Sequence, residues 1–391
     1  MSIRIAILGT RGIPNHYGGF EQIAGYLARG LVEKGHEVTV YNTHNHPYKK
    51  GSWNGVRIIH RFDPSHLIGT AGQFIYDLNC IRHARREKFD VIIMLGYTSS
   101  SLWGRLYPKN ATIITNMDGL EWKRTQYNQL TRRFLQYAEK LAVKYSHAHI
   151  ADSLGVKKYL QESYPIHPTY IPYGAEIINE LDETIVTTHA LIKRAYHLLI
   201  ARMEPENNIE MILSGFCASN SSQTFVVVGN TGNRYGRYLL KKFGHHPQIK
   251  FIGAVFNITA LHTLRCYCQL YFHGHSVGGT NPSLLEAMAA KAPIVAHDNV
   301  FNKHILGEQA LYFSSAREIT AIIEKGLPAE KKARLAQDNF NKILATYNWP
   351  SIVEAYEKLI YSYCNMPLPE TPVLPARYAG NNVAEKQPVL I

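Results

Sequence analysis

The feature that most constrains this fold is a repeated alternation of short apolar runs with stretches of helical periodicity. The apolar run Arg4–Leu8 ends at Gly9, as a buried parallel strand does, and residues 21–33 then place apolar side chains on one helical face. Strand, helix and strand in succession imply right-handed crossovers and a doubly wound parallel sheet. Later strands of this half are predicted at residues 37–41, 56–60, 90–95, 112–115 and 149–151.

The same alternation restarts in the second half, with strands predicted at residues 196–201, 224–228, 250–252, 270–272 and 293–296. We therefore predict an α/β protein of two doubly wound, Rossmann-like domains that face each other across a cleft. Ligands of such sheets bind beyond the carboxyl ends of the strands. The predicted parts are an N-terminal domain at 1–172, a linker at 173–188, a second domain at 189–345, a helix at 346–366 that returns to the first domain, and a mobile tail at 367–391.

Composition excludes several other classes of protein. The 46% hydrophobic content is too high for a chain that is disordered over most of its length, and no apolar run approaches the ~18 residues of a membrane-spanning helix. The five cysteines form no CxxC pair, so neither a disulfide framework nor a zinc ribbon is indicated. Among the 19 histidines, His44 and His46 have no acidic partner nearby in sequence, and no metal site is expected. These features predict a cytoplasmic protein.

Charge is distributed unevenly along the chain. Residues 1–172 hold 22 Lys and Arg against 12 Asp and Glu, a net charge of +10, whereas the remaining residues hold 20 against 18, a net charge of +2. A cationic domain of this kind faces a polyanion, which is nucleic acid, an anionic membrane or a phosphorylated substrate. The sequence has no helix-turn-helix signature and no RNP-type aromatic strand, so nucleic acid is not the expected partner.

Residues 126–147 are predicted as an amphipathic helix in this cationic half. One face is apolar and should pack on the sheet; its members are Leu130, Phe134, Ala138, Leu141 and Tyr145. The other faces carry bases that, with those of residues 82–88, are suited to hold the domain against anionic lipid. These bases are Arg132, Arg133, Lys140 and Lys144.

A glycine-rich loop follows the first strand and leads into the first helix. Gly18 and Gly19 stand at the predicted helix start, where backbone N–H groups and the helix dipole suit a phosphate or a sugar hydroxyl. Gly9 and Gly12 lie three apart, so the dinucleotide-binding pattern G-x-G-x-x-G is not met. The alternative is a tight turn with a purely structural role.

A sharper signal follows the strand at 270–272. Gly278 and Gly279 allow the backbone to approach an anion, and Thr280 and Asn281 offer oxygens that cap a helix or contact a ligand. Glu286 lies one turn into the helix that follows, where its carboxylate can accept both hydroxyls of a ribose. The alternative is a capped helix that carries a solvated Glu.

Two further strand ends carry polar side chains. Arg202 follows the strand at 196–201, and its guanidinium matches the oxygens of a diphosphate, although a lone Arg is more often a surface ion-pair partner. Asp118 follows the strand at 112–115, where it is suited to position or deprotonate an acceptor hydroxyl. Asp118 is equally suited to cap the helix that follows.

The chain resembles retaining glycosyltransferases of family 4, which have the GT-B fold, and within them the bacterial rhamnosyltransferases of surface polysaccharide synthesis. The resemblance covers roughly residues 3–360. It implies a nucleotide-sugar donor held mainly by the C-terminal domain, an acceptor on the N-terminal domain, and neither an essential metal ion nor another cofactor. It rests on Tyr17-Gly18-Gly19-Phe20-Glu21, on Asn116-Met117-Asp118-Gly119, on residues 201–207, on Val228-Gly229-Asn230 and on residues 273–288.

Taken residue by residue, the resemblance assigns Arg202 to the donor diphosphate, Glu286 to the ribose, Gly18 and Gly19 to the phosphate and sugar, and Val255 to the nucleobase. Two positions depart from the family pattern. The first Glu of its E-x7-E motif is Gly278 here, and the Lys usually five after the Arg is Asn207. Donor-sugar contacts are therefore expected from Thr280, Asn281 or His275 instead. Asn207 and Gly279 are also expected among the residues that bind the nucleotide-sugar.

These observations lead to one expected function and one alternative. The expected function is transfer of a sugar, with rhamnose as the resemblance suggests, from a nucleotide diphosphate to a lipid-linked or saccharide acceptor with retention. Asp118 is the expected catalytic residue, and the expected location is the inner face of the cell membrane. The alternative is a basic nucleic-acid-binding or other non-enzymatic binding protein, which the charge of residues 1–172 motivates.

Overall fold

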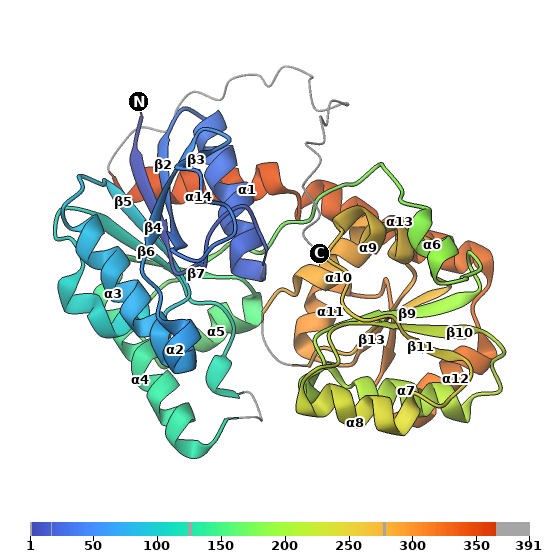
Figure 1. Cartoon of the computed structure of the whole chain (residues 1–391). Coiled ribbons are helices and arrows are strands. Elements are labelled where there is room, and N and C mark those ends of the chain that lie inside the picture. The colour runs from blue at the N-terminus through green and yellow to red at the C-terminus, as the bar shows by residue number, and fades with distance from the viewer. Residues whose placement is uncertain (1, 17, 124–126, 277–278, 365–391) are drawn as a thin grey trace.

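The computed structural model describes residues 2–16, 18–123, 127–276 and 279–364. These residues form two α/β domains, each built on a central sheet with helices on both faces (Figure 1). The predicted mobile tail at 367–391 lies outside the described residues. The predicted fold class, GT-B with two Rossmann-like domains, is confirmed by the two sheets and by the structural relatives reported below.

The first sheet has the strand order β3-β4-β2-β1-β5-β6-β7-β8, and all its pairings are parallel except that of β3 with β4. Its strands are β1 Arg4–Leu8, β2 Glu37–Thr43, β3 Ser52–Trp53, β4 Val56–Arg61, β5 Val91–Leu95, β6 Thr112–Asn116, β7 Ala148–Ala151 and β8 Thr169–Tyr170. Its α-helices are α1 Gly19–Glu33, α2 Ser65–Ile68, α3 Gly72–Ala84, α4 Gln129–Tyr145 and α5 Leu154–Ser163. The short 3-10 helices are η1 Gly69–Ala71, η2 Ser100–Leu106 and η3 Glu121–Lys123.

The second sheet is wholly parallel, in the order β11-β10-β9-β12-β13-β14. Its strands are β9 Tyr196–Ile200, β10 Thr224–Val228, β11 Ile249–Phe251, β12 Leu270–His273, β13 Ile294–His297 and β14 Leu311–Phe313. Its helices are α6 Thr184–Thr188, η4 Pro205–Asn207, α7 Ile209–Ala218, α8 Arg234–Phe243, α9 Ile258–Tyr267, α10 Pro282–Ala289, α11 Val300–Leu306, α12 Ala316–Lys325 and α13 Ala329–Ala345. The last helix of the described residues, α14 Trp349–Tyr363, returns to the first domain.

Both sheets are buried on both faces, which explains their continuous apolar runs. In β1, Ile5 and Ile7 join the core under α1, whereas Leu8 joins a separate core with Tyr76 of α3. Successive side chains of a strand point to opposite faces, so a strand covered on both sides has to be apolar throughout.

The chain passes between the domains twice, and the two passages lie side by side. Ala175, on the first passage, donates its backbone N–H to the carbonyl of Tyr347 on the second at 2.7 Å. Close by, the rings of Tyr26 and Trp349 stack with their centroids 4.4 Å apart. Helix α14 then packs on α1 of the first domain (Figure 1).

Helix α4 differs from the prediction in the face that it buries. Its buried residues are Leu135, Ala138, Glu139 and Ala142, whereas Leu130 is 75% exposed. Helix α4 is amphipathic as predicted, but its buried face is turned about the helix axis from the predicted apolar face. The buried face includes the carboxylate of Glu139, which a hydrophobic pattern cannot recognise.

Candidate active site

The candidate active site lies where the first turns of two helices from different domains meet. Gly19 begins α1 and Pro282 begins α10, and a Cβ atom added at Gly19 would lie 3.8 Å from Cγ of Pro282. The first N–H groups of a helix have no partner within the helix, and the helix dipole makes that end positive. Two such ends at one place favour an anion between the domains.

The glycine-rich loop before α1 is held by Glu21. The buried Glu21 carboxylate accepts hydrogen bonds from the backbone N–H of Arg11 at 2.8 Å and from the Thr10 hydroxyl at 3.3 Å. Gly18 is the N-cap of α1 and has an extended backbone. Glu21 therefore acts inside its own loop, which it fixes just before Gly19 meets Pro282 of the second domain.

The carboxylate of Glu286 is held by a cation that sequence analysis missed. Nη2 of Arg265, on α9, lies 2.5 Å from Oε2 of Glu286, and the Arg265 side chain is only 3% exposed. From the other domain, Nε2 of Gln22 donates to Oε1 of Glu286 at 3.3 Å. The Glu286 side chain, 29% exposed, keeps lone pairs for a ligand and is bonded from both domains. No motif marks Arg265, which lies in the last turn of α9 rather than at the end of a strand.

The loops after β9 and β12 are joined by side-chain hydrogen bonds. Asn207 donates to the carbonyl oxygen of Arg202 at 2.8 Å, and its amide oxygen lies 3.0 Å from Nδ1 of His275. Asn208 donates to the carbonyl oxygen of Gly274 at 2.8 Å. The backbone of Arg202 is thereby fixed while its side chain is exposed at the carboxyl end of the sheet.

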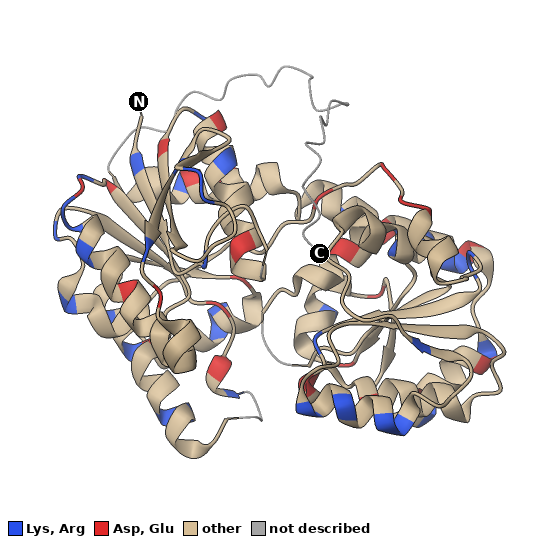
Figure 2. Ribbon diagram, in the orientation of Figure 1, with Lys and Arg blue, Asp and Glu red and all other residues tan. Residues whose placement is uncertain are grey.

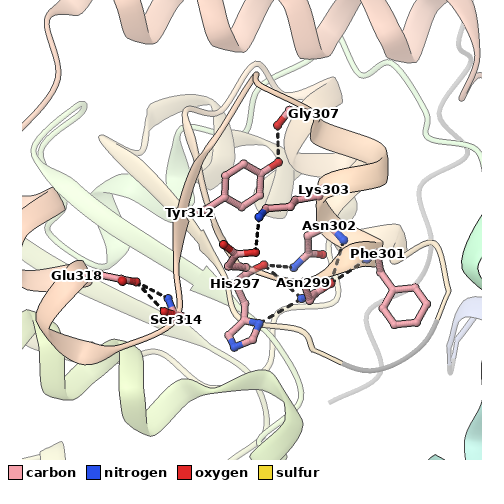
Figure 3. Close-up of polar contacts among 10 residues, drawn as sticks. His297, Asn299, Phe301, Asn302, Lys303, Gly307, Tyr312, Ser314 and Glu318 are labelled. Atoms are coloured by element: carbon pink, nitrogen blue, oxygen red, sulfur yellow. Dashed lines mark hydrogen bonds and ion pairs between the residues drawn. The ribbon is translucent and has the colours of Figure 1, made fainter.

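A third loop, after β13, supports His275 from the other side. The amides of Asn299 and Asn302 each donate to the carbonyl oxygen of His275 at 3.0 Å. Asn299 also caps α11 by accepting from the backbone N–H groups of Phe301 and Asn302 (Figure 3). Sequence analysis missed both asparagines, although Asn299 follows a strand end and precedes a helix, which is the pattern of a cap.

The remaining residues predicted on the donor side have different surroundings. Asn281 caps α10, because its side chain accepts from the backbone N–H of Ser283 at 2.9 Å. The Thr280 hydroxyl donates to the carbonyl oxygen of Asp152 in the first domain. Val255 is half-buried in the loop after β11, at the same sheet edge but two strands away from β9.

Asp118 and its neighbour Asp152 end two adjacent strands of the first sheet. Asp118 has a φ of 52°, a left-handed conformation that Asp tolerates better than most residues. Its backbone N–H donates to Oδ1 of Asn116 at 2.9 Å. The N-cap of α4 is Asn128, so Asp118 does not cap that helix. Asp152 follows β7 directly, the same strand-end signal that identified Asp118, and was not predicted.

Burial dominates the electrostatics of this region. Burial, followed by the charge of Asp118, raises the pKa of the Asp152 carboxyl well above its usual range. Burial also lowers the pKa of His273, at the end of β12, to about 3, so this imidazole is neutral at physiological pH. Over the described ranges, no group of three or more His, Cys, Asp or Glu side chains is placed to hold a metal ion.

Two sequence families match successive parts of the chain. Residues 3–176 match a domain of unknown function, DUF1972, and residues 188–340 match the family Glycosyl transferases group 1. No curated protein matches the chain in sequence.

Solved structures share the fold across nearly the whole chain. Sucrose-phosphate synthase from Thermosynechococcus elongatus is 15% identical with a TM-score of 0.77, and the match covers 92% of this chain and 99% of that one. Anabaena HepE in complex with UDP and glucose is 13% identical with a TM-score of 0.69, covering 92% and 100%. WaaG, a glycosyltransferase involved in lipopolysaccharide biosynthesis, is 16% identical with a TM-score of 0.68, covering 92% and 99%. Residues 188–340 therefore resemble the glycosyl transferases group 1 family, and the chain has the GT-B fold.

Proposed function

We propose that the protein transfers a sugar from a nucleotide diphosphate sugar to a lipid-linked or saccharide acceptor, with retention of the anomeric configuration. The observation that carries the proposal is the meeting of the α1 and α10 helix starts, at Gly19 and Pro282, between the two domains. A diphosphate bound there would receive backbone N–H groups from both domains. Binding of the donor would thereby favour the arrangement of the domains in which these two helix starts meet.

Each donor group has a proposed partner at this site. Arg202 would pair with the diphosphate, because its exposed side chain stands on a fixed backbone at the end of β9. Glu286 would accept the ribose hydroxyls, and Val255 would lie against the nucleobase. Asp118 would take the proton of the acceptor hydroxyl. Neither a metal ion nor another cofactor is part of this proposal.

The complexes of Anabaena HepE with UDP and with UDP-glucose support a uridine nucleotide as the first donor to test. Rhamnose on a thymidine nucleotide is the proposal that the resemblance to rhamnosyltransferases supports. The experiment is a panel of nucleotide-sugars scored by thermal shift, since a ligand at about 100 times its Kd stabilises a protein by about 2.7 kcal/mol. Release of nucleoside diphosphate and the anomeric configuration of the product then establish the reaction.

Replacing Arg202 by Ala should weaken binding of the nucleoside diphosphate by about 1.5–3 kcal/mol, the range for hydrogen bonds to charged groups. Arg317→Ala is the matched control, because Arg317 is an exposed arginine of α12. Equal affinities in Arg202→Ala, Glu286→Ala and the parent would refute the assignment of the donor site.

We further propose that the first domain docks on the anionic inner face of the cell membrane, where a lipid-linked acceptor of surface polysaccharide synthesis would be presented. Helices α2, α3 and α4 lie on one outer side of this domain (Figure 1), and Figure 2 shows Lys and Arg along α3 and α4. Large apolar side chains are also exposed there, with Leu67 72% and Leu130 75% accessible. Arg61, Arg82 and Arg86 line a surface pocket beside Phe62. Within the part of the chain that the structure describes, no helix is long and apolar enough to span a membrane.

Co-sedimentation with vesicles of varied anionic lipid content tests the docking surface. Binding should grow with anionic lipid and weaken with salt, because exposed charges are screened over ~8 Å at physiological ionic strength. Charge reversal at Arg133, Lys140 and Lys144 of α4 should abolish binding, whereas reversal at Lys325 and Lys331 of the second domain should preserve it. Binding that ignores lipid charge and salt would refute this surface.

A further inference from the structure

Asp118 and Asp152 are brought together by the register of two neighbouring strands. Asn116 of β6 pairs with Ile150 of β7, and each aspartate stands two residues beyond that pair. Adjacent strands lie roughly 5 Å apart, so the two carboxyl groups leave the sheet as neighbours. The second acid therefore stands beside the group that we propose to receive the acceptor proton.

Asp152 is enclosed by the opposite domain. Its residue surface is only 2% exposed, and its Oδ1 atom has no hydrogen-bond partner among the described residues. A Cβ atom added at Gly279 would lie 2.0 Å from both carboxylate oxygens, so the carboxyl group occupies the space where a side chain at position 279 would begin. The Thr280 hydroxyl holds the carbonyl oxygen of the same residue. A buried acid with an unused oxygen thus lies between the acceptor side and the donor loop.

Among the described residues, the titratable groups that face Asp152 are acids and phenols and offer it no positive charge. They are the carboxylate of Asp118 after β6 and the phenols of Tyr170 in β8, Tyr173 beyond β8 and Tyr356 in α14. Burial raises the pKa of each of the three phenols, so all three are neutral. Two like charges in one desolvated place repel each other strongly, and such pairs retain one proton between them. Asp118 is the less buried of the two acids, so desolvation disfavours a negative charge less at Asp118 than at Asp152.

We propose that Asp152 is a positioning residue of the transfer site, a protonated acid that hydrogen-bonds to Asp118 and leaves that neighbour as the single negative charge. The inference rests on the proposed function and deepens it. In the transfer step the acceptor oxygen bonds to the anomeric carbon while the bond from that carbon to the diphosphate breaks with its electron pair. The acceptor proton goes to Asp118, whose direction is set by the hydrogen bond from Asp152.

The protonation of Asp152 can be measured without any substrate. The infrared spectrum of the parent protein at pH 8 should show the band of a protonated carboxyl group. The difference spectrum between the parent and Asp152→Asn should show that the variant lacks this band. Asp77→Asn is the matched control and should leave the band, because burial raises the pKa of Asp77 only to about 7. Asp118→Asn gives a second measurement, since loss of the neighbouring charge should move the midpoint of the band's titration to lower pH. The absence of the band in the parent, or its survival in Asp152→Asn, would overturn the proposal.

The pH profile of turnover distinguishes positioning from a merely structural role. In the parent, turnover should fall at alkaline pH as the shared proton is lost, because two buried charges repel each other and the anionic donor. Asp152→Asn should keep turnover at pH 7 within about threefold and lose the alkaline fall, whereas Asp152→Ala should lose about tenfold or more. An unchanged alkaline fall in Asp152→Asn, or parental turnover in Asp152→Ala, would overturn the assignment. If the parent releases no nucleoside diphosphate from any nucleotide-sugar, the proposed function fails, and the infrared band still decides the state of Asp152.

Discussion

Two interior carboxylates of the first domain are equally buried and differently surrounded. Glu139 of α4 is 1% exposed, and Asp152 after β7 is 2% exposed. The oxygens of Glu139 accept four hydrogen bonds, at 2.7 to 3.3 Å, from Tyr97, Trp122, Tyr159 and Tyr164. Asp152 instead has an unused oxygen, a like-charged neighbour and the loop of another domain against it.

The contrast shows that two equally buried carboxyl groups differ in the hydrogen-bond partners of their oxygens, and that this difference separates their roles. A buried charge whose lone pairs are filled by the protein stabilises one arrangement of its neighbours. A buried acid left with an open oxygen is destabilising for its own fold unless a neighbour pairs with it, so its presence points to a function. Glu139 is therefore interpreted as structural and Asp152 as functional, which variants can test.

The largest expected effect is on the free energy of unfolding and comes from Glu139, the carboxylate interpreted as structural. Glu139→Ala removes the acceptor of four donors and should lower the free energy of unfolding by about 4 kcal/mol, since each buried unpaired donor loses about 1–3 kcal/mol. Urea unfolding measures the change. Glu162→Ala is the control, because its carboxylate makes only an exposed i,i+4 ion pair with Lys158. If Glu139→Ala lowers the free energy of unfolding by less than about 1 kcal/mol, Glu139 is not the structural carboxylate that this comparison requires.

The next effect is on activity rather than on stability. Asp118→Asn keeps the shape of the side chain and removes its charge, so turnover should fall about 100-fold while donor affinity and the unfolding midpoint stay unchanged. Asp90→Asn serves for comparison, because Asp90 lies at the opposite, amino end of β5 and pairs with Arg4. Parental turnover in Asp118→Asn would leave that residue without a role in transfer.

A third buried acid, Asp77, extends the comparison to the pH dependence of the free energy of unfolding. Asp77 accepts a hydrogen bond from Ser99, and burial raises its pKa to about 7. Because the folded form binds this proton more tightly than the unfolded chain, stability should fall as the pH rises from about 4 to about 7, by about 1.4 kcal/mol per pKa unit. Asp77→Asn should flatten that slope in unfolding measured at pH 5 and pH 8. Equal slopes in the parent and the variant would contradict the shifted pKa.

The smallest expected change is in the stability of Asp152→Asn. Asp152→Asn replaces one neutral group by another of similar shape, so the free energy of unfolding at pH 6 should change by less than about 1 kcal/mol. Urea unfolding of Asp152→Asn and Glu139→Ala under identical conditions is the measurement. A loss in Asp152→Asn as large as that in Glu139→Ala would show that both carboxylates are structural.

Strand positions could be predicted closely from the sequence, because a sheet covered on both faces leaves continuous apolar runs. The bounds predicted for β1 and β10 are those of the structure, and the ends of β6 and β9 differ by one residue. Strands β3, β8 and β14 were missed, and all three are edge strands of only two or three residues. The parallel order places all carboxyl ends at one edge, so candidates chosen at strand ends were bound to be near one another.

Side-chain partners could not be predicted in the same way. Arg265 reaches Glu286 from another helix, 21 residues earlier in the chain, and periodicity describes a helix without naming its neighbours. The space beside Gly279 is filled by Asp152 from the other domain, a contact that depends on how the two sheets are oriented. The interior position of Glu139 depends on three tyrosines and a tryptophan from other segments.

The double passage between the domains has a consequence for synthesis on the ribosome. Helix α14 lies on α1, where Val353 fills the space beside Gly30 and Glu357 pairs with Lys34 and His36. The first domain thus begins with the first strand and is completed only after the whole second domain has been made. Until α14 emerges, the apolar surface of α1 that it covers stays open to other chains, so the nascent first domain is exposed to aggregation while the second domain is being synthesised.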